Sequence, residues 1–158
     1  MNVAAEPVSP PATMPRQRRG KPLLPVRGVC SLIDRDENQT LRLIEEGQIA
    51  WCFDLTLDPT HARAKELRVL PAAVSDFMRG QTCSLKWPDV LALVVPPDSS
   101  RVSSVQIMRA LNVSGDHIYN MVRRRVLIPC STWHRGRGGA ARFETKSFVE
   151  FLQSRRFH

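Results

Sequence analysis

The sequence VSSVQIMRALNVSGDHIYNMVRRRVLIPCSTWHRGRGGAARFETKSFVEF, residues 102–151, decides the fold that we expect for this chain. Apolar residues recur at helical spacing on both sides of a short polar turn, which predicts two amphipathic helices. A loop rich in glycine and arginine follows, and an apolar helix closes the stretch. We interpret the stretch as a helix-turn-helix with a wing, and the rest of the chain as an altered copy of it plus a basic arm.

Local signals fix the ends of these two helices. Ser103 is a good N-cap, and Gln106 three residues later completes a capping box. Asn112 stands at the turn, where a left-handed backbone is usual and asparagine replaces glycine well. Ser114 caps the second helix. Residues 133–139 form the predicted wing.

Charge divides the chain into basic and acidic parts. The 158 residues carry a formal net charge of +8, which suggests a polyanion such as nucleic acid as partner. By segment, the net charge is +4 over residues 1–28, −3 over residues 29–80, −1 over residues 81–100 and +8 over residues 101–158. We therefore expect the last segment and the N-terminal arm to carry most of the attraction to phosphate.

Several classes of protein are disfavoured by what the sequence lacks. The four cysteines form no C-x-x-C pair, so we interpret them as free thiols in a reducing compartment and expect no metal site. No signal peptide or apolar run of transmembrane length is present, which predicts a cytoplasmic protein associated with the nucleoid and no membrane contact. Hydrolase, P-loop and zinc-protease motifs are missing, so we expect neither an enzyme nor a cofactor.

The N-terminal segment, residues 1–28, holds six of the twelve prolines and predicts a disordered basic arm. Within it, Arg19-Gly20-Lys21-Pro22 resembles an AT-hook, an extended motif that enters the minor groove of A·T-rich DNA. The other interpretation is a solvated basic tail that adds only nonspecific attraction. The cations that could contact DNA from this arm are Arg16, Arg18, Arg19 and Lys21.

Residues 29–80 predict a winged unit of their own. Turn and cap residues at 34–36 separate two short helices, and Gly47 ends the second helix. Residues 49–57 and 65–70 alternate as two strands, and Pro71 begins a last helix. The apolar positions expected to point inward are Val29, Leu32, Ile33, Val74, Phe77 and Met78 here, and Val105, Ile107, Met108, Leu111, Ile118, Met121, Val122, Phe143, Phe148, Phe151 and Leu152 in the later unit.

Residues 81–100 predict an apolar joint followed by a proline-rich linker. Val90, Leu91, Leu93 and Val94 are too apolar for a free linker. They pack either between the two units or against a second copy of the protein, so a homo-oligomer stays open.

The two predicted units align with each other. A shift of 78 residues places Ile33 on Leu111 and Asp36 on Ser114, and beyond the wing the shift becomes 74. The apolar and cap positions agree although few residues are identical. We therefore predict an α+β protein, mainly helical with small β wings, built from two tandem units over residues 29–80 and 101–158.

Residues 112–129, with Asn-Val-Ser at the turn and Arg-Val-Leu-Ile-Pro after the second helix, and the wing before Arg142-Phe143 resemble the winged helix-turn-helix of the MerR and phage-excisionase group. The resemblance covers most of residues 29–155, more loosely in the first unit. It implies DNA binding, with the second helix in the major groove and the wing on the backbone or minor groove. This chain departs from the group at Arg125, where glycine is usual, and it lacks the MerR dimerisation helix and effector domain.

The expected DNA-contacting residues lie on the second helix and wing of the later unit. Polar, aromatic and basic side chains there suit contacts to base edges and phosphates. They are Ser114, His117, Tyr119, Asn120, Arg123, Arg124, His134, Arg135, Arg137 and Arg142. We place His117 and Asn120 together on the outer face of the helix, while Tyr119 has core packing as its alternative.

Two functions remain open for the whole chain. One is sequence-specific binding of double-stranded DNA, as a transcription regulator or an excisionase-like recombination directionality factor. The other is an adaptor that binds a protein partner through residues 29–95, such as a recombinase or a replication or transcription protein, and tethers it to DNA through the basic unit. The first unit offers a secondary DNA contact through Asn38, Gln39, Arg42, Arg63 and Lys65, but its Glu37, Glu45 and Glu46 repel phosphate.

Overall fold

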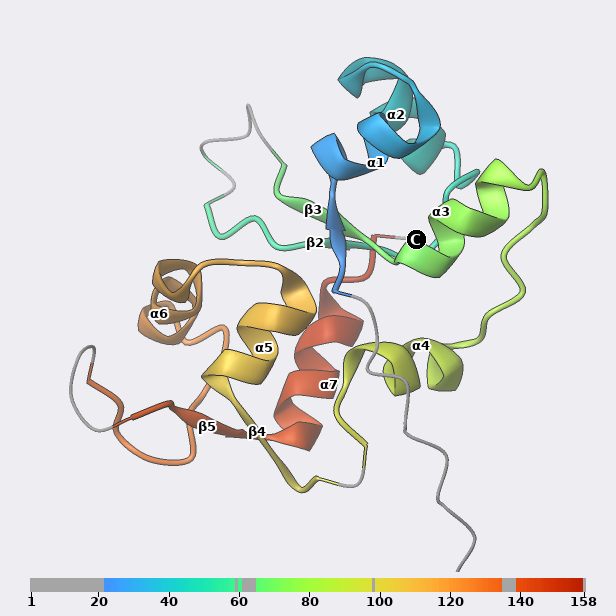
Figure 1. The fold of residues 1–158 in the computed structure, drawn as a ribbon. Helices are drawn as coiled ribbons and strands as arrows, with labels where there is room; N and C mark the ends of the chain where they lie inside the picture. The colour runs from blue at the N-terminus through green and yellow to red at the C-terminus, as the bar shows by residue number, and fades with distance from the viewer. Residues whose placement is uncertain (1–21, 59, 61–64, 98, 135–138, 158) are drawn as a thin grey trace, which may run out of the picture.

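A computed structural model describes residues 22–58, 60, 65–97, 99–134 and 139–157. Seven helices and two small antiparallel sheets make up this part of the chain, which is an α+β arrangement as expected. The two sheets lie in different parts of the molecule, and helix α7 runs between them (Figure 1).

The earlier part of the chain builds a three-stranded sheet with three helices. Its strands are in the order β1-β3-β2, and both pairings are antiparallel. The elements are β1 (Leu24–Pro25), α1 (Val26–Ile33), α2 (Glu37–Glu45), β2 (Cys52–Asp54), β3 (Leu67–Val69) and α3 (Pro71–Met78).

The later part builds a two-stranded antiparallel sheet, β4-β5, with four helices. Its elements are α4 (Trp87–Val94), β4 (Arg101–Ser103), α5 (Ser104–Leu111), α6 (Gly115–Arg123), β5 (Arg142–Glu144) and α7 (Thr145–Ser154). In both parts a short strand leads directly into a helix pair, α1–α2 or α5–α6, and pairs with the strand that precedes the last helix.

The predicted helix caps are confirmed. Ser103 and Gln106 form a reciprocal capping box at the start of α5. Asp36 and Ser114 each accept a hydrogen bond from the backbone N–H three residues later, which satisfies an otherwise unpaired donor of α2 and α6. Asn112 has a φ of 54° and ends α5 in the left-handed conformation.

Backbone hydrogen bonds repeat along the chain at the predicted shift of 78 residues. The Gly47 N–H donates to the Ile44 carbonyl at 3.0 Å, and the Arg125 N–H donates to the Val122 carbonyl at 3.0 Å. Asp34, with a φ of 53°, stands where Asn112 stands in the later part. The two helix pairs therefore share their turn and end geometry although their sequences differ.

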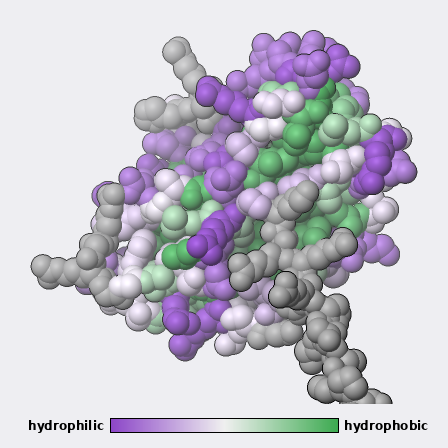
Figure 2. All heavy atoms as spheres, in the orientation of Figure 1, coloured by the Kyte–Doolittle hydropathy of each residue, from purple (hydrophilic) through white to green (hydrophobic). Residues whose placement is uncertain are grey.

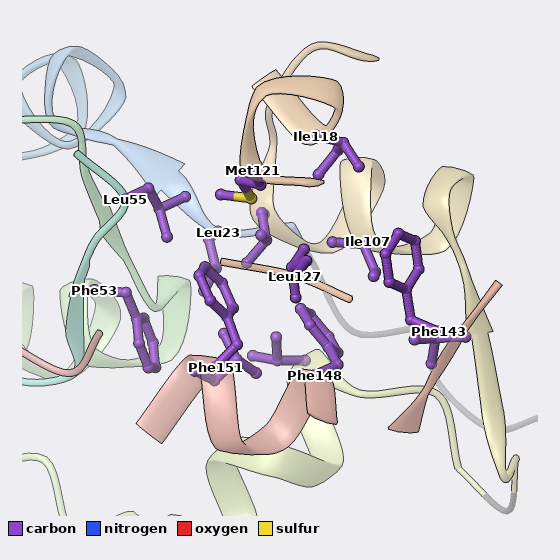
Figure 3. Close-up of a cluster of buried hydrophobic side chains, with 14 of the residues drawn as sticks. Leu23, Phe53, Leu55, Ile107, Ile118, Met121, Leu127, Phe143, Phe148 and Phe151 are labelled. Carbon is purple, nitrogen blue, oxygen red and sulfur yellow. The ribbon is translucent and has the colours of Figure 1, made fainter. Parts of the chain in front are cut away.

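One hydrophobic core serves both parts of the chain. Phe53 and Leu55 from the segment around β2 lie in the same buried cluster as Ile107, Met121 and the phenylalanines at 143, 148 and 151 (Figure 3). Val90 and Val94 of α4 are buried in this cluster, with exposed fractions of 1% and 6%. Val90 and Val94, with the partly buried Leu91, therefore pack between the two parts, whereas Leu93 is 39% exposed. The buried residues of a smaller cluster all come from the earlier part, and Phe157 from the segment after α7 packs against them.

Two polar contacts also join the parts. The buried Arg68 side chain on β3 donates hydrogen bonds to the carbonyls of Leu111 and Asn112 at the end of α5. At the β2 edge of the sheet, the Asp54 N–H donates to the Arg155 carbonyl and the Phe157 N–H donates to the Cys52 carbonyl, each at 2.8 Å. The segment after α7 thus pairs with β2.

Some sequence expectations are wrong in detail. The arm expected to extend to residue 28 overlaps β1 and α1, because Leu23 and Val26 are buried in the two clusters and Pro25 needs no ladder donor at a sheet edge. The strand expected over residues 49–57 is only Cys52–Asp54, because Trp51 has a φ of 58° and breaks the extended run. Leu32, Met78 and Val105 are exposed rather than inward.

Candidate nucleic-acid interface

Helix α6 presents four different sides. Ile118 and Met121 point into the core, and their exposed fraction is 0%. Asp116, Asn120 and Arg123 are exposed and lie at helical spacing on one open side. The side with His117 and Arg124 faces the earlier part of the chain, and Tyr119 faces the loop that precedes β5.

His117 lies against β3 and not on the outer face where we expected it. Its side chain is 13% exposed, and Nδ1 lies 3.2 Å from a carboxylate oxygen of Glu66. Nε2 is buried and has no hydrogen-bond partner among the described residues. Helical spacing in the sequence separates a polar residue from the core of its own unit, but it does not show whether another segment covers that residue.

The pKa of His117 is lowered below its ordinary value of 6.5, chiefly because burial penalises the charged imidazolium. The nearby Glu66 carboxylate acts in the opposite direction, and the Arg68 guanidinium adds to the lowering. Burial prevails because the Glu66 side chain is 37% exposed, so that solvent weakens its attraction. His117 is therefore neutral at pH 7 and is a poor phosphate ligand.

Arg124 is held by the segment that follows β2. Its Nη1 donates to the Leu57 carbonyl at 2.8 Å, and Nη2 lies 3.5 Å from a carboxylate oxygen of Asp58. The side chain is 49% exposed, so the guanidinium keeps N–H groups directed to solvent. Figure 1 shows α6 at the left, with the β2–β3 segment above it and the loop before β5 below it.

A cleft of about 310 Å³ opens between α6 and the segment after β2. It is lined by Leu57, Asn120, Arg123 and Arg124. Three of the residues expected to contact DNA therefore lie together, and two of them are arginines. A guanidinium pair beside an amide suits an anion with several oxygens, such as a phosphodiester.

The remaining expected residues are spread around this helix. Ser114 is occupied as the N-cap of α6. The rings of Tyr119 and Trp133 meet edge to face with centroids 5.8 Å apart, so the Tyr119 side chain is half-buried against the wing. His134 and Arg142 are exposed, the latter on β5. Arg135 and Arg137 lie outside the described residues.

Among the secondary candidates for DNA contact in the earlier unit, Arg42 and Lys65 each lie beside a glutamate carboxylate. Asn38, Gln39 and Arg42 are exposed on α2, but the Arg42 Nε lies 2.9 Å from a carboxylate oxygen of Glu46. The Lys65 ammonium lies 3.9 Å from Glu45. The candidates outside the described residues are Arg16, Arg18, Arg19, Lys21 and Arg63.

Sequence reasoning missed the residues that the earlier part contributes next to α6. Leu57 and Asp58 contact Arg124, while Glu66 contacts His117. Their sequence context indicates only strand ends and a turn. The contacts depend on how the two parts pack, for which the sequence pattern carries no signal.

The thiols show no sign of pairing, and all four cysteines are free. Burial raises the pKa of Cys52 to about 12, which keeps it as a neutral thiol in the core. Within the described residues, every helix falls short of the length and apolar character needed to cross a bilayer.

Scans against protein-family models, curated proteins and solved structures each found no match to this chain. Any assignment of function therefore depends on the residues and their geometry.

Proposed function

We propose that this chain binds double-stranded DNA through α6, as a transcription regulator or a recombination directionality factor. The observation that carries the proposal is the open side of α6, where Asn120 and Arg123 stand next to Arg124 at the end of a capped helix pair. A helix of this kind fits the major groove, with amide and guanidinium groups that suit adenine and guanine edges.

The arrangement around the helix supports the same proposal. The turn between α5 and α6 contains Asn112, whose backbone is left-handed, and Ser114, which caps the start of α6, as in a helix-turn-helix. The loop predicted as the wing, residues 133–139, follows α6 in the sequence and leads to β5, which pairs with β4. The earlier part repeats the order strand, helix, helix, strand, helix, with β2 as an additional strand, which supports the interpretation as two winged units.

Salt dependence and one pair of charge reversals test this proposal. We expect the affinity for duplex DNA, measured by fluorescence anisotropy, to fall steeply as salt rises. Arg123→Glu should weaken binding by about tenfold or more, because it places a carboxylate on the phosphate-facing helix.

Arg79→Glu is the matched control, since it makes the same change in net charge at the exposed end of α3, far from α6 (Figure 1). It should leave affinity within about twofold of wild type, because distant exposed charges are screened. Equal affinities for the two variants, or binding that does not respond to salt, would refute DNA binding through α6.

The second candidate function is the adaptor, which the surface of the earlier part favours. Leu32 and Met78 are 50% and 58% exposed on α1 and α3. Figure 2 shows a hydrophilic region at the top, where α1 and α2 meet, and hydrophobic residues gathered below it over α1. Apolar side chains exposed beside charged ones suit contact with another protein.

Full-length variants distinguish the two functions, because both parts of the chain share one core. The double substitution Leu32→Ser and Met78→Ser should leave DNA binding unchanged. If the adaptor function holds, it should abolish the regulatory or recombination phenotype in cells.

A further inference from the structure

The segment that follows β2 forms one wall of the cleft beside α6. The helix supplies Asn120, Arg123 and Arg124, and the earlier part of the chain supplies Leu57. Asp58 adds its carboxylate beside Arg124. The site thus combines residues from two parts of the chain that the sequence treats as separate units.

Three contacts hold this wall in place against the helix. Arg124 donates to the Leu57 carbonyl, and His117 meets Glu66 at 3.2 Å. Arg68, 9% exposed, anchors β3 to the carbonyls at the end of α5. Both sides of the cleft are therefore fixed relative to each other before any ligand binds, which lowers the entropic cost of binding.

The charges of the cleft favour an anion. Among the described residues, Arg123 and Arg124 contribute two positive charges, and Asp58 contributes one negative charge. The Arg124–Asp58 contact is long, at 3.5 Å, whereas the bond from Arg124 to the neutral Leu57 carbonyl is 2.8 Å. The carbonyl orients the guanidinium, and the Asp58 carboxylate offsets only part of the positive charge that Arg123 and Arg124 bring to the cleft.

Helix α2 of the earlier part is a weaker candidate for binding DNA phosphates. Its Arg42 is paired with Glu46, and its exposed residues include Glu37 and Glu45. A phosphate that approached this helix would meet net negative charge. The contribution of the earlier part to DNA binding is therefore better placed at the wall beside α6.

We infer that the cleft between α6 and the segment after β2 receives the sugar–phosphate backbone of the DNA duplex, so that the earlier part acts as a second wing for α6. The inference rests on the proposed DNA binding. In this arrangement α6 is the one reading helix, with the wall at Leu57 on one side and Trp133 of the following loop on the other.

Opposite charges placed at one wall position test the inference in the full-length protein. Leu57 is half-buried, so any packing defect should affect Leu57→Lys and Leu57→Glu alike. If the cleft holds phosphates, the Lys variant should bind duplex DNA at least about tenfold more tightly than the Glu variant at low salt. Equal affinities for the two folded variants would overturn the inference.

A milder substitution keeps the inference testable if both Leu57 variants unfold. Asp58→Asn removes a negative charge from a side chain that is 36% exposed and leaves the Leu57 carbonyl to hold Arg124. The cleft predicts an affinity gain of about threefold or more, since one repulsive charge leaves the phosphate path. Unchanged or weaker binding would overturn it.

Two further variants separate this inference from the proposed function. Arg42→Ala on α2 should change affinity by less than about twofold, because its charge is already paired with Glu46; a larger loss would assign DNA reading to α2 and overturn the inference. Arg123→Glu should weaken binding through α6 itself. If Arg123→Glu weakens binding while the Leu57 pair bind equally, only the cleft is refuted. If Arg123→Glu also binds normally, the proposed function fails as well.

Discussion

The surroundings of His117 in the structure do not suit the DNA-contacting role that its sequence position suggests. Its position on a polar helix suggests a DNA contact, but its side chain is 13% exposed and faces Glu66 across the contact between the two parts. The imidazole is neutral because burial lowers its pKa. A neutral buried histidine stabilises the folded protein only while it is not forced to accept a proton.

Acidification should therefore destabilise the fold through His117. The unfolded chain binds a proton near the ordinary pKa of 6.5, whereas the folded chain does so only at lower pH. We expect the free energy of unfolding to decrease as pH falls below 6.5, and to decrease less in His117→Gln. Urea unfolding at several pH values measures this difference, and parallel curves for the two proteins would contradict it.

At the scale of elements, the ends of α2 and α6 use one backbone geometry with different residues. Gly47 has a φ of 71°, and Arg125, 78 positions later, has a φ of 56°. Glycine adopts this conformation without cost, while an L-residue with a side chain is strained in it by about 1–2 kcal/mol. The backbone at Arg125 therefore keeps the left-handed turn although the residue is unfavourable there.

A reciprocal exchange tests this strain. Arg125→Gly should raise the free energy of unfolding by about 0.5–1 kcal/mol, after allowance for the greater freedom of glycine in the unfolded chain. Gly47→Arg should lower it by a similar amount, mainly through strain, because a Cβ atom added at this position meets no atom within 4 Å. Thermal or urea denaturation measures both changes.

The two substitutions should have opposite signs. A loss of stability in Arg125→Gly would mean that the arginine side chain makes a stabilising contact that outweighs the strain. In duplex-DNA binding, Arg125→Gly should instead lose affinity, since it removes a cation next to Arg124.

Local signals predicted these elements well, because caps and turns depend on neighbouring residues. Ser103 with Gln106, Asn112 and Gly47 all have the predicted roles. The short strands β1 and β4 were missed, since two or three residues carry too little pattern. The sequence predicted three residues of the cleft as DNA contacts, Asn120, Arg123 and Arg124, and these residues lie together. It did not predict Leu57, because the position of Leu57 beside α6 depends on packing between distant segments.

At the scale of the whole molecule, the two parts depend on each other. They share one core, and the segment after α7 pairs with β2 of the earlier part. The Arg156 guanidinium also lies 4.3 Å from the centre of the Trp51 ring, which is consistent with a cation–π contact. A change at this segment should therefore alter the earlier part, far away in sequence.

Removal of residues 155–158 tests this dependence. The truncation deletes the two backbone hydrogen bonds with β2, the hydrogen bond from Arg155 to the Thr56 carbonyl and the contact with Trp51, which together contribute at least about 2 kcal/mol. We expect a lower melting temperature and faster amide exchange in β2. As a control, Arg156→Ala keeps the strand pairing and should lose less than half as much stability. Unchanged exchange in β2 after truncation would contradict the predicted dependence.

The pairing between β2 and the segment after α7 has a consequence for how the protein is made. Arg155 and Thr56, which hydrogen-bond in the folded molecule, are 99 positions apart. The residues that pair with the edge of β2 leave the ribosome much later than β2 itself. Until then this edge is open to other strands. A chaperone that covers this edge during translation would protect the nascent chain from aggregation.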